Sequence, residues 1–227
     1  MSPSSRYNRR ERPAKPALTR DGIVSTATEL MLREGIERVT MRRLAQELDT
    51  GPASLYVYVS DTDELHGAVL DGLLGEVDIR PSDGDWRERL WQIVSSYRTV
   101  LFAHPSLARV ALVTPLSGPN YLAIIDAILA LLAEGGMTTS QAAWAVDMLL
   151  LIATAAAVEH GSTQTSATSE RDRDQILSSI RTASADAYPH IAAASTELVS
   201  GTGESRSRWA FDALLNGAME TTPPNGD

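Results

Sequence analysis

The 227-residue chain contains no cysteine, only two phenylalanines, and an aromatic share of 5%. The absence of cysteine excludes disulfide bonds, thiolate metal ligands and a thiol nucleophile. The sequence also lacks an uninterrupted apolar run of about 18 residues, the length that predicts a transmembrane helix. Its polar, arginine-rich N-terminus has no apolar segment of the kind found in signal peptides, so we expect a cytoplasmic protein without a membrane partner.

Histidine is also scarce, and its spacing matches no catalytic or zinc-binding motif. The four histidines are His66, His104, His160 and His190. Asp147, Glu159 and His160 would suit an acid–base or metal-ligand set, but the Glu-x-x-His spacing used in helical bundles does not occur. No glycine-rich phosphate-binding loop is present either. The sequence therefore predicts no enzyme, no metal site and no cofactor.

Basic residues are fewer than acidic ones. The chain has 20 Lys and Arg and 29 Asp and Glu, which gives a net charge of −9. The deficit is uneven along the chain. Residues 1–60 carry ten basic and seven acidic side chains, a net of +3, whereas residues 61–227 carry a net of −12. Chance surface composition is one explanation. The other is a polyanionic partner such as DNA, which only the N-terminal part would attract.

Residues 40–59 are the most informative segment and predict two short helices joined by a tight turn. Thr40 is a suitable N-cap. Apolar residues at helical spacing then form one buried stripe: Met41, Leu44, Ala45 and Leu48. Asp49-Thr50-Gly51 ends the first helix, since aspartate tolerates the left-handed conformation, and Pro52 starts the second. The second helix presents three hydroxyl side chains on its exposed face: Ser54, Tyr56 and Tyr58. This is the arrangement of a helix-turn-helix.

The flanking residues complete a small N-terminal domain over residues 18–79. Residues 1–17 form a basic, proline-containing arm that either lies along DNA or is a solvated tail. A helix is predicted from an N-cap at Thr19 to Glu34, ended by Gly35. Its inner stripe consists of Ile23, Ala27, Leu30 and Met31. A further helix starts at Asp61, with Glu64 as its capping-box partner, and continues to about Val77.

Residues 80–220 predict a second, larger helical domain. After a turn-rich linker, amphipathic segments follow at about 85–103, 106–112, 119–135 and 139–160. The segment 161–169 has low complexity and no apolar periodicity, so we expect a loop there. Helices are expected again at about 170–187 and 204–220, without a firm assignment between them, and residues 221–227 should be disordered. No strand pattern of useful length occurs, so the predicted fold class is all-α.

Residues 18–77 resemble the N-terminal domain of tetracycline-repressor-type (TetR family) transcription regulators. The matching features are Gly35-Ile36 before Thr40, the string LAQEL at 44–48, and Leu55-Tyr56-x-Tyr58-Val59 followed by a capped helix. Residues 80–220 are similar, more loosely, to the tetracycline-repressor-like C-terminal domain, through pairs such as His104-Pro105 and Gly118-Pro119. The resemblance implies a homodimer whose two recognition helices enter successive major grooves of a palindromic operator. It also implies a small-molecule effector that releases the DNA.

The resemblance further implies DNA contacts from particular positions, which are Arg42, Pro52, Ala53, Ser54, Tyr56 and Tyr58. Their chemistry agrees, because arginine binds phosphates or guanine, hydroxyls bond to bases or phosphates, and small apolar groups suit thymine methyls. Packing of the Tyr56 ring into the small core is an equal alternative.

One position departs from the family pattern. Members usually carry a lysine at the start of the fourth helix, where it holds a phosphate, and this chain has Thr62 there, between Asp61 and Asp63. A hydroxyl and the helix N-terminal N–H groups still suit a phosphate, but two carboxylates oppose it. We therefore expect Thr62 to give a weaker electrostatic grip, which the arginine-rich arm is placed to offset.

Candidate effector-binding residues combine apolar walls with a few polar groups, as ligand pockets do. They are Tyr97, His104, Asn120, Tyr121, Trp144, Met148, Glu159 and His160. Trp and Met at helical spacing are also typical of plain core. The tetracycline repressors hold a metal–drug chelate partly through a histidine in a short helix, and the corresponding residues 108–114 contain none. We therefore expect no tetracycline–magnesium ligand, and the effector stays unidentified.

The resemblance places the dimer interface in the helices around residues 142–159 and 206–219. The first of these is apolar nearly all round and rich in alanine, as expected for a helix buried on several sides, although a wholly intramolecular core would look similar. Two other functions stay open. One is a helical protein-binding module whose helix-turn-helix does not touch DNA, and the other is an activator without small-molecule control.

Overall fold

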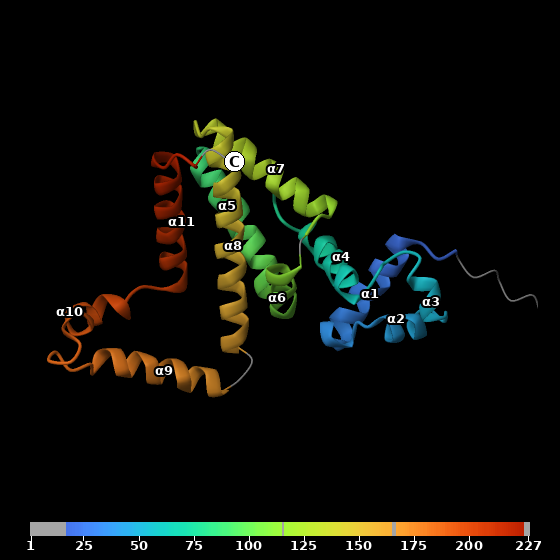
Figure 1. Ribbon diagram of the computed structural model, residues 1–227, viewed down its shortest axis with the longest axis horizontal. Coiled ribbons are helices and arrows are strands. Elements are labelled where there is room, and N and C mark those ends of the chain that lie inside the picture. The colour runs from blue at the N-terminus through green and yellow to red at the C-terminus, as the bar shows by residue number, and fades with distance from the viewer. Residues whose placement is uncertain (1–16, 115, 165–166, 225–227) are drawn as a thin grey trace, which may run out of the picture.

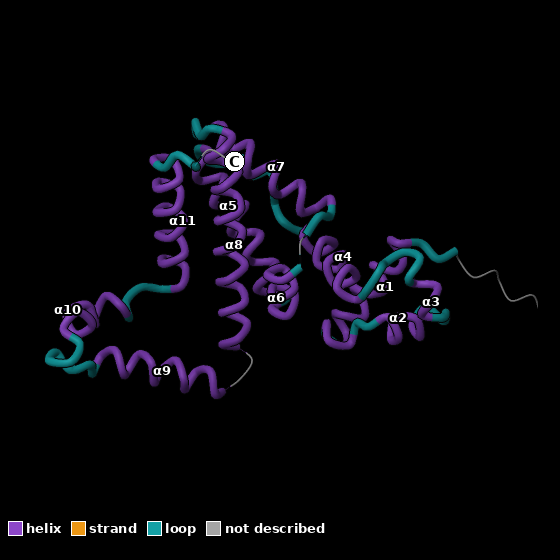
Figure 2. The backbone as a smooth tube through the Cα atoms, viewed as in Figure 1, coloured by secondary structure: helices purple, strands orange, loops and turns teal. Residues whose placement is uncertain are grey.

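The computed structural model describes residues 17–114, 116–164 and 167–224, and within these ranges it contains helices and no strands (Figure 2). The elements are α1 (Arg20–Glu34), the 3-10 helix η1 (Ile36–Arg38), α2 (Met41–Glu47), α3 (Pro52–Leu55), α4 (Thr62–Leu74), α5 (Trp86–Ala103), α6 (Pro105–Val113), α7 (Pro119–Glu134), α8 (Thr139–Gln164), α9 (Ala167–Arg181), α10 (Pro189–Leu198) and α11 (Gly203–Glu220). The predicted all-α fold class is confirmed. The predicted N-terminal arm lies outside the described residues except for Ala17.

The N-terminal head is built from α1, η1, α2, α3 and the start of α4. Thr19 caps α1 as predicted, because its Oγ1 accepts a hydrogen bond from the Gly22 N–H at 3.1 Å. Gly35 ends this helix at a φ of 87°, which glycine adopts without steric cost. The predicted inner stripe is confirmed, since all four of its residues are buried: Ile23, Ala27, Leu30 and Met31.

Helix α4 connects the head to the helical body, which is built from α5, α6, α7, α8 and α11 (Figure 1). It packs against α1 on the head side and against α6 and α7 on the body side. Asp61 is its N-cap, as predicted, and accepts a hydrogen bond from the Glu64 N–H at 2.8 Å. One continuous helix therefore touches both the head and the body.

The long helix α8 lies at the centre of the body, in contact with α5, α6, α7 and α11 (Figure 1). Between Thr139 and Glu159 its length and composition would suffice to cross a membrane, with a mean hydropathy of 1.7. One side of α8 is packed into the body, including Leu149, Leu150 and Ala153. Packing in the body buries 44% of this apolar stretch, and large apolar side chains such as Trp144 and Leu151 stay exposed.

The structure corrects two predictions in the second half of the chain. The loop expected over 161–169 is wrong for most of its length, because α8 continues to Gln164 and α9 begins at Ala167. A helix that is already formed extends by one hydrogen bond per residue, so it needs no apolar periodicity to continue. The missing side chain of Gly161 lets α8 pack closely against α6, since an added Cβ would lie 2.1 Å from the Cβ of Pro105 in α6.

The helix expected over 170–187 ends earlier, and α10 follows it. Helix α9 ends at Arg181, and α10 occupies the stretch that had no firm assignment. Pro189 is the first residue of α10, the position where proline is tolerated because its missing N–H has no helical partner. Helices α9 and α10 pack against each other and project from the body beside the lower ends of α8 and α11 (Figure 1).

Candidate functional site

The turn between α2 and α3 has the geometry predicted from the sequence. Thr40 caps α2 through a hydrogen bond from the Arg43 N–H to its Oγ1 at 3.2 Å. Asp49 adopts a φ of 49°, and it is the single non-glycine residue with positive φ in the described ranges. Gly51 is the N-cap of α3 and Pro52 its first residue. Local sequence chemistry therefore determines how α3 leaves α2.

The outer face of α3 and of the turn after it is open to solvent. Leu55 and Val59 are buried at 0% and 1% exposure and hold this segment against the head. The residues of the first turn are exposed, namely Pro52, Ala53 and Ser54. Tyr56 is 54% exposed, so its ring points outward rather than into the core. Val57, 79% exposed, also belongs to this face; sequence reasoning missed it because an apolar residue between tyrosines gives no sign of its direction.

Tyr58 and Thr62, which follow α3 along the chain, are less exposed than this face. Tyr58 is half-buried and packs against the core of the head. Thr62 is half-buried at the start of α4. Beside it, Glu64 accepts hydrogen bonds from the Ser60 N–H at 2.7 Å and the Ser60 hydroxyl at 2.8 Å, and these donors lower the pKa of Glu64. With Asp61 already bonded to the helix N-terminus, a phosphate near Thr62 would meet two carboxylates.

Two adjacent arginines in α2 have different environments. Arg43 is held by Glu34 at 2.6 Å and by Glu47 at 2.8 Å, and Glu47 also pairs with Arg33 at 2.6 Å. Arg42 is exposed, and none of the ion pairs among the described residues involves it. Arg43 therefore ties α2 to α1, whereas Arg42 is available to an external anion.

The Arg43 network should make stability depend on pH in the acid range. The hydrogen bond from Arg43 lowers the pKa of Glu34 below its ordinary 4.5, and Arg33 and Arg43 do the same to Glu47. A lowered folded-state pKa gives stability that is present above the ordinary pKa and is lost as the pH falls through the folded-state pKa. We expect Arg43→Met to lower the Tm at neutral pH and to flatten its fall below pH 4.5, as followed by circular dichroism.

The matched control for this prediction is Arg42→Met on the neighbouring, unpaired arginine, which should retain the acid profile of the native chain. Coincident profiles for Arg43→Met and the native protein would show that the network does not couple to folding.

A buried carboxylate joins α4 to α7. Asp71 of α4, 7% exposed, accepts hydrogen bonds from the N–H of Tyr121 at 2.9 Å and from the N–H of Asn120 at 3.4 Å. The N-cap residue of α7 is Gly118, which has no side chain to cap the helix. Asp71 therefore supplies from another helix the capping carboxylate that α7 lacks, and the helix dipole favours its charge.

The predicted effector residues lie in two different environments. Tyr97 is buried, and His104, Asn120 and Tyr121 are half-buried in the body. Trp144 and Met148 of α8 are 58% and 45% exposed, and Glu159 is exposed as well. The side chain of His160 lies outside the described residues. None of these described residues lines the cavity between α5, α8 and α11, the one beside Asp71 and Gly118, or the one between α9 and α10. The structure therefore does not bring all of them together.

Tyr97 is committed to a hydrogen-bonded chain in the core. Its hydroxyl lies 2.9 Å from Thr154 Oγ1, and that hydroxyl donates to the carbonyl oxygen of Leu150 at 2.7 Å. Since the single proton of Thr154 is used there, Tyr97 is the donor to Thr154. Burial raises the pKa of Tyr97 to about 12, so the phenol stays protonated and able to donate.

Together these features define a helix-turn-helix protein whose exposed α3 face is carried on a helical body by one connecting helix. The chain belongs to the tetR family of bacterial regulatory proteins, whose N-terminal domain it matches over residues 23–69. Residues 80–220 match the tetracyclin repressor-like C-terminal domain. The family suggested by residues 18–77 is confirmed.

Three similar proteins come from Streptomyces species. SCO7704, a proposed transcription regulator of Streptomyces coelicolor, is 52% identical, and its structure covers 94% of this chain and 100% of its own at a TM-score of 0.81. The TetR family protein ActR of S. coelicolor, solved with actinorhodin, is 33% identical over 89% of this chain and 96% of its own, at a TM-score of 0.78. The transcriptional repressor DrrR1 of Streptomyces coeruleorubidus is 35% identical over 62% of this chain and 53% of its own. The chain thus spans about half the length of the curated relatives it matches.

Proposed function

We propose that this protein is a cytoplasmic, ligand-responsive transcriptional repressor that binds a palindromic operator as a homodimer. The observation that carries the proposal is the solvent-exposed outer face of α3, together with the unpaired Arg42 of α2. The relatives support the regulatory part, because DrrR1 is a transcriptional repressor and ActR binds actinorhodin.

In the proposed complex, the α3 face enters the major groove. The hydroxyls of Ser54 and Tyr56 bond to base edges or phosphates, and the apolar side chains of this face contact thymine methyls: Pro52, Ala53 and Val57. Arg42 binds a phosphate or a guanine. Tyr58 and Thr62 contact the backbone at the edge of the groove. The head spans residues 18–79 in this proposal, and the effector and dimerisation domain spans residues 80–220.

The proposed dimer joins α8 and α11 to the same helices of a second copy, within residues 142–159 and 206–219. Large apolar side chains on these helices are open to solvent in the single chain: Trp144 is 58%, Leu151 48% and Trp209 74% exposed. Helices α8 and α11 pack side by side. Exposed apolar patches of this kind mark interaction surfaces, and two helices from each copy would form a four-helix bundle. The position of Trp144 and Met148 is better explained by this interface than by a ligand cavity.

For the effector, we propose the interior of the body near Tyr97, His104, Asn120 and Tyr121. Asn120 and Tyr121 contact Asp71 of α4 directly. A ligand that shifts the first turn of α7 would therefore pull on the helix that carries the head. Such a shift would change the spacing between the two heads of a dimer and release the operator, since half-site spacing is a geometric requirement.

A substitution at Arg42 tests the DNA-reading role. On an operator obtained by selection from random sequences, we expect Arg42→Ala to weaken binding roughly 10- to 100-fold at low salt, which corresponds to about 1.4–2.8 kcal/mol in total for the two subunits. Fluorescence anisotropy with labelled duplexes gives the Kd. Arg181→Ala removes the same charge from an exposed site on α9 and should leave the affinity unchanged. Failure to select any sequence, or equal effects of both variants, would contradict the proposed function.

A further inference from the structure

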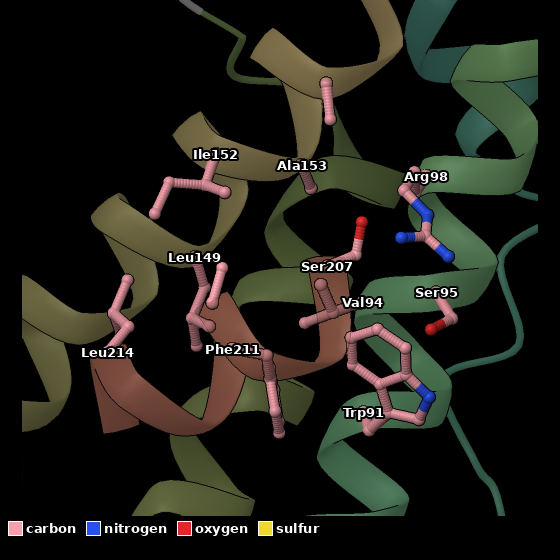
Figure 3. Close-up of a pocket in the computed structure, with 12 residues that line it drawn as sticks. Trp91, Val94, Ser95, Arg98, Leu149, Ile152, Ala153, Ser207, Phe211 and Leu214 are labelled. Carbon is pink, nitrogen blue, oxygen red and sulfur yellow. The ribbon is translucent and has the colours of Figure 1, made fainter. Parts of the chain in front are cut away.

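A small cavity lies where α5, α8 and α11 meet. Trp91, Ser95 and Arg98 line it from one face of α5, since their spacing of four and three residues places them one above the other. Ser207 and Phe211 line it from α11 in the same way. Figure 3 shows the guanidinium of Arg98, the hydroxyl of Ser207 and the rings of Trp91 and Phe211 around one space.

Arg98 is a nearly buried cation with unused hydrogen-bonding capacity. Its side chain is 12% exposed, and its ion pair is a loose 3.7 Å contact with Glu204, a side chain that is 73% exposed. Its guanidinium also lies over the rings of Trp91 and Phe102 at 5.4 and 5.5 Å. A guanidinium has five N–H donors, and no hydrogen bond accepts from Arg98 among the described residues. By contrast, Arg208 is bonded to Glu88 at 2.8 Å and to Asp212 at 3.2 Å.

A second polar group of the cavity is also unsatisfied. The hydroxyl oxygen of Ser95 is buried, and no described residue bonds to it. Buried polar groups normally have a partner, because leaving one unpaired costs free energy. Arg98 and Ser95 are one helical turn apart and line the same cavity, so a single acceptor placed between them would satisfy both.

The size and walls of the cavity limit what the acceptor belongs to. The cavity holds about 40 Å³, well below the 300–1,000 Å³ typical of drug-sized ligands. Its remaining wall is apolar, from residues such as Leu149 and Phe211. One cation matches one negative charge, and a planar carboxylate fits the two-pronged donor geometry of arginine. A phosphate dianion would lack a second cation.

We propose that this cavity binds a small monocarboxylate with a short apolar body. Arg98 pairs with the carboxylate in place of Glu204, Ser95 donates to it, and Leu149 and Phe211 cover the apolar part. The site is separate from Tyr97, Asn120 and Tyr121, so it goes beyond the effector region of the proposed function.

Titration with isobutyrate, followed by ligand-observed NMR, tests the site in the full chain. We expect saturable binding with a Kd on the order of 1 mM, and binding of the neutral isobutyramide to be weaker roughly 10- to 100-fold, the ratio for losing a charged hydrogen bond. Arg98→Met should weaken isobutyrate binding by a similar factor, and Ser95→Ala by a smaller one. Arg87→Met, on the same helix and also paired with α11 but outside the cavity, should bind like the native protein.

Glu204→Gln provides a test that does not depend on a core substitution, because Glu204 is on the surface. Removing this competitor for Arg98 should strengthen isobutyrate binding several-fold. No saturation in the native chain, equal binding of acid and amide, or equal binding by Arg98→Met would overturn the proposal. Operator binding by the same proteins is measured separately, without isobutyrate. If they fail to bind DNA in that measurement, the result counts against the repressor function and not against this site.

Discussion

Thr62→Lys is expected to tighten operator binding roughly 10- to 50-fold at 0.1 M salt and to steepen the salt dependence by about 2 units of slope, because one added phosphate contact per subunit releases about 0.9 counterion each. Thr62 is the first residue of α4, which follows α3 along the chain, and Asp61 and Glu64 lie beside it. A lysine there would supply the charge that these carboxylates oppose. Anisotropy titrations from low to high salt measure both quantities.

Thr221→Lys is the matched control for this substitution. It makes the same change of charge at the exposed end of α11, which Figure 1 shows far from the head. This control should leave the slope within experimental error of the native value. A Thr62→Lys protein with the native slope would show that the start of α4 does not approach the DNA backbone.

Gly118→Ala is expected to lower the free energy of unfolding by about 2–4 kcal/mol, or the Tm by roughly 5–12 °C. A Cβ at this position would lie 2.1–2.4 Å from the carboxyl atoms of Asp71. The carboxylate would have to move and would lose the hydrogen bonds from Asn120 and Tyr121 while remaining buried. Thermal melts followed by circular dichroism measure the loss, and operator affinity should fall as well, because α4 carries the head.

Gly72→Ala is a sharp control, because it lies next to Asp71 in α4 and an added Cβ there meets nothing within 4 Å. Alanine is the better helix former, so this variant should be as stable as the native chain or more stable by about 0.5–1 kcal/mol. If Gly118→Ala melted together with Gly72→Ala, Asp71 would not be the joint between α4 and α7.

Most of the head could be predicted from the sequence because its determinants are local. The caps at Thr19, Thr40 and Asp61 and the left-handed Asp49 each depend on residues within about four positions along the chain. The buried stripe of α1 follows from helical spacing alone. The direction of an exposed side chain was harder to predict. The sequence left two equal alternatives for the Tyr56 ring and gave no sign that Val57 is exposed.

The rest of the structure could not be predicted, because it depends on contacts between distant residues. Asp71 caps a helix that starts about fifty residues later, and nothing near Gly118 indicates this partner. The cavity around Arg98 forms only when α11 packs on α5 and α8. The helical segments at 161–164 and 189–198 lacked a periodic apolar signal. The candidate effector residues were chosen by residue type, which does not indicate the direction of a side chain. For this reason some of them lie in the interior and others on the proposed dimer surface.

The interface proposed for α8 and α11 would hold two heads at a fixed spacing. A single head presents only a short exposed face, and two heads held at a fixed spacing give the affinity and selectivity of a palindromic site. Leu151, 48% exposed on α8, lies on the proposed dimer face, and a glutamate there would place like charges opposite each other across a two-fold axis.

The most direct measurement is footprinting on a selected operator, combined with light scattering of the free and DNA-bound protein. If the protein is a dimeric helix-turn-helix repressor, the native chain will be a dimer that protects two inverted half-sites separated by about one helical turn of DNA, roughly 34–36 Å. Leu151→Glu will be monomeric and will lose the footprint at the same concentration. A monomeric native chain, or protection of a single half-site that Leu151→Glu retains, would contradict the dimeric repressor.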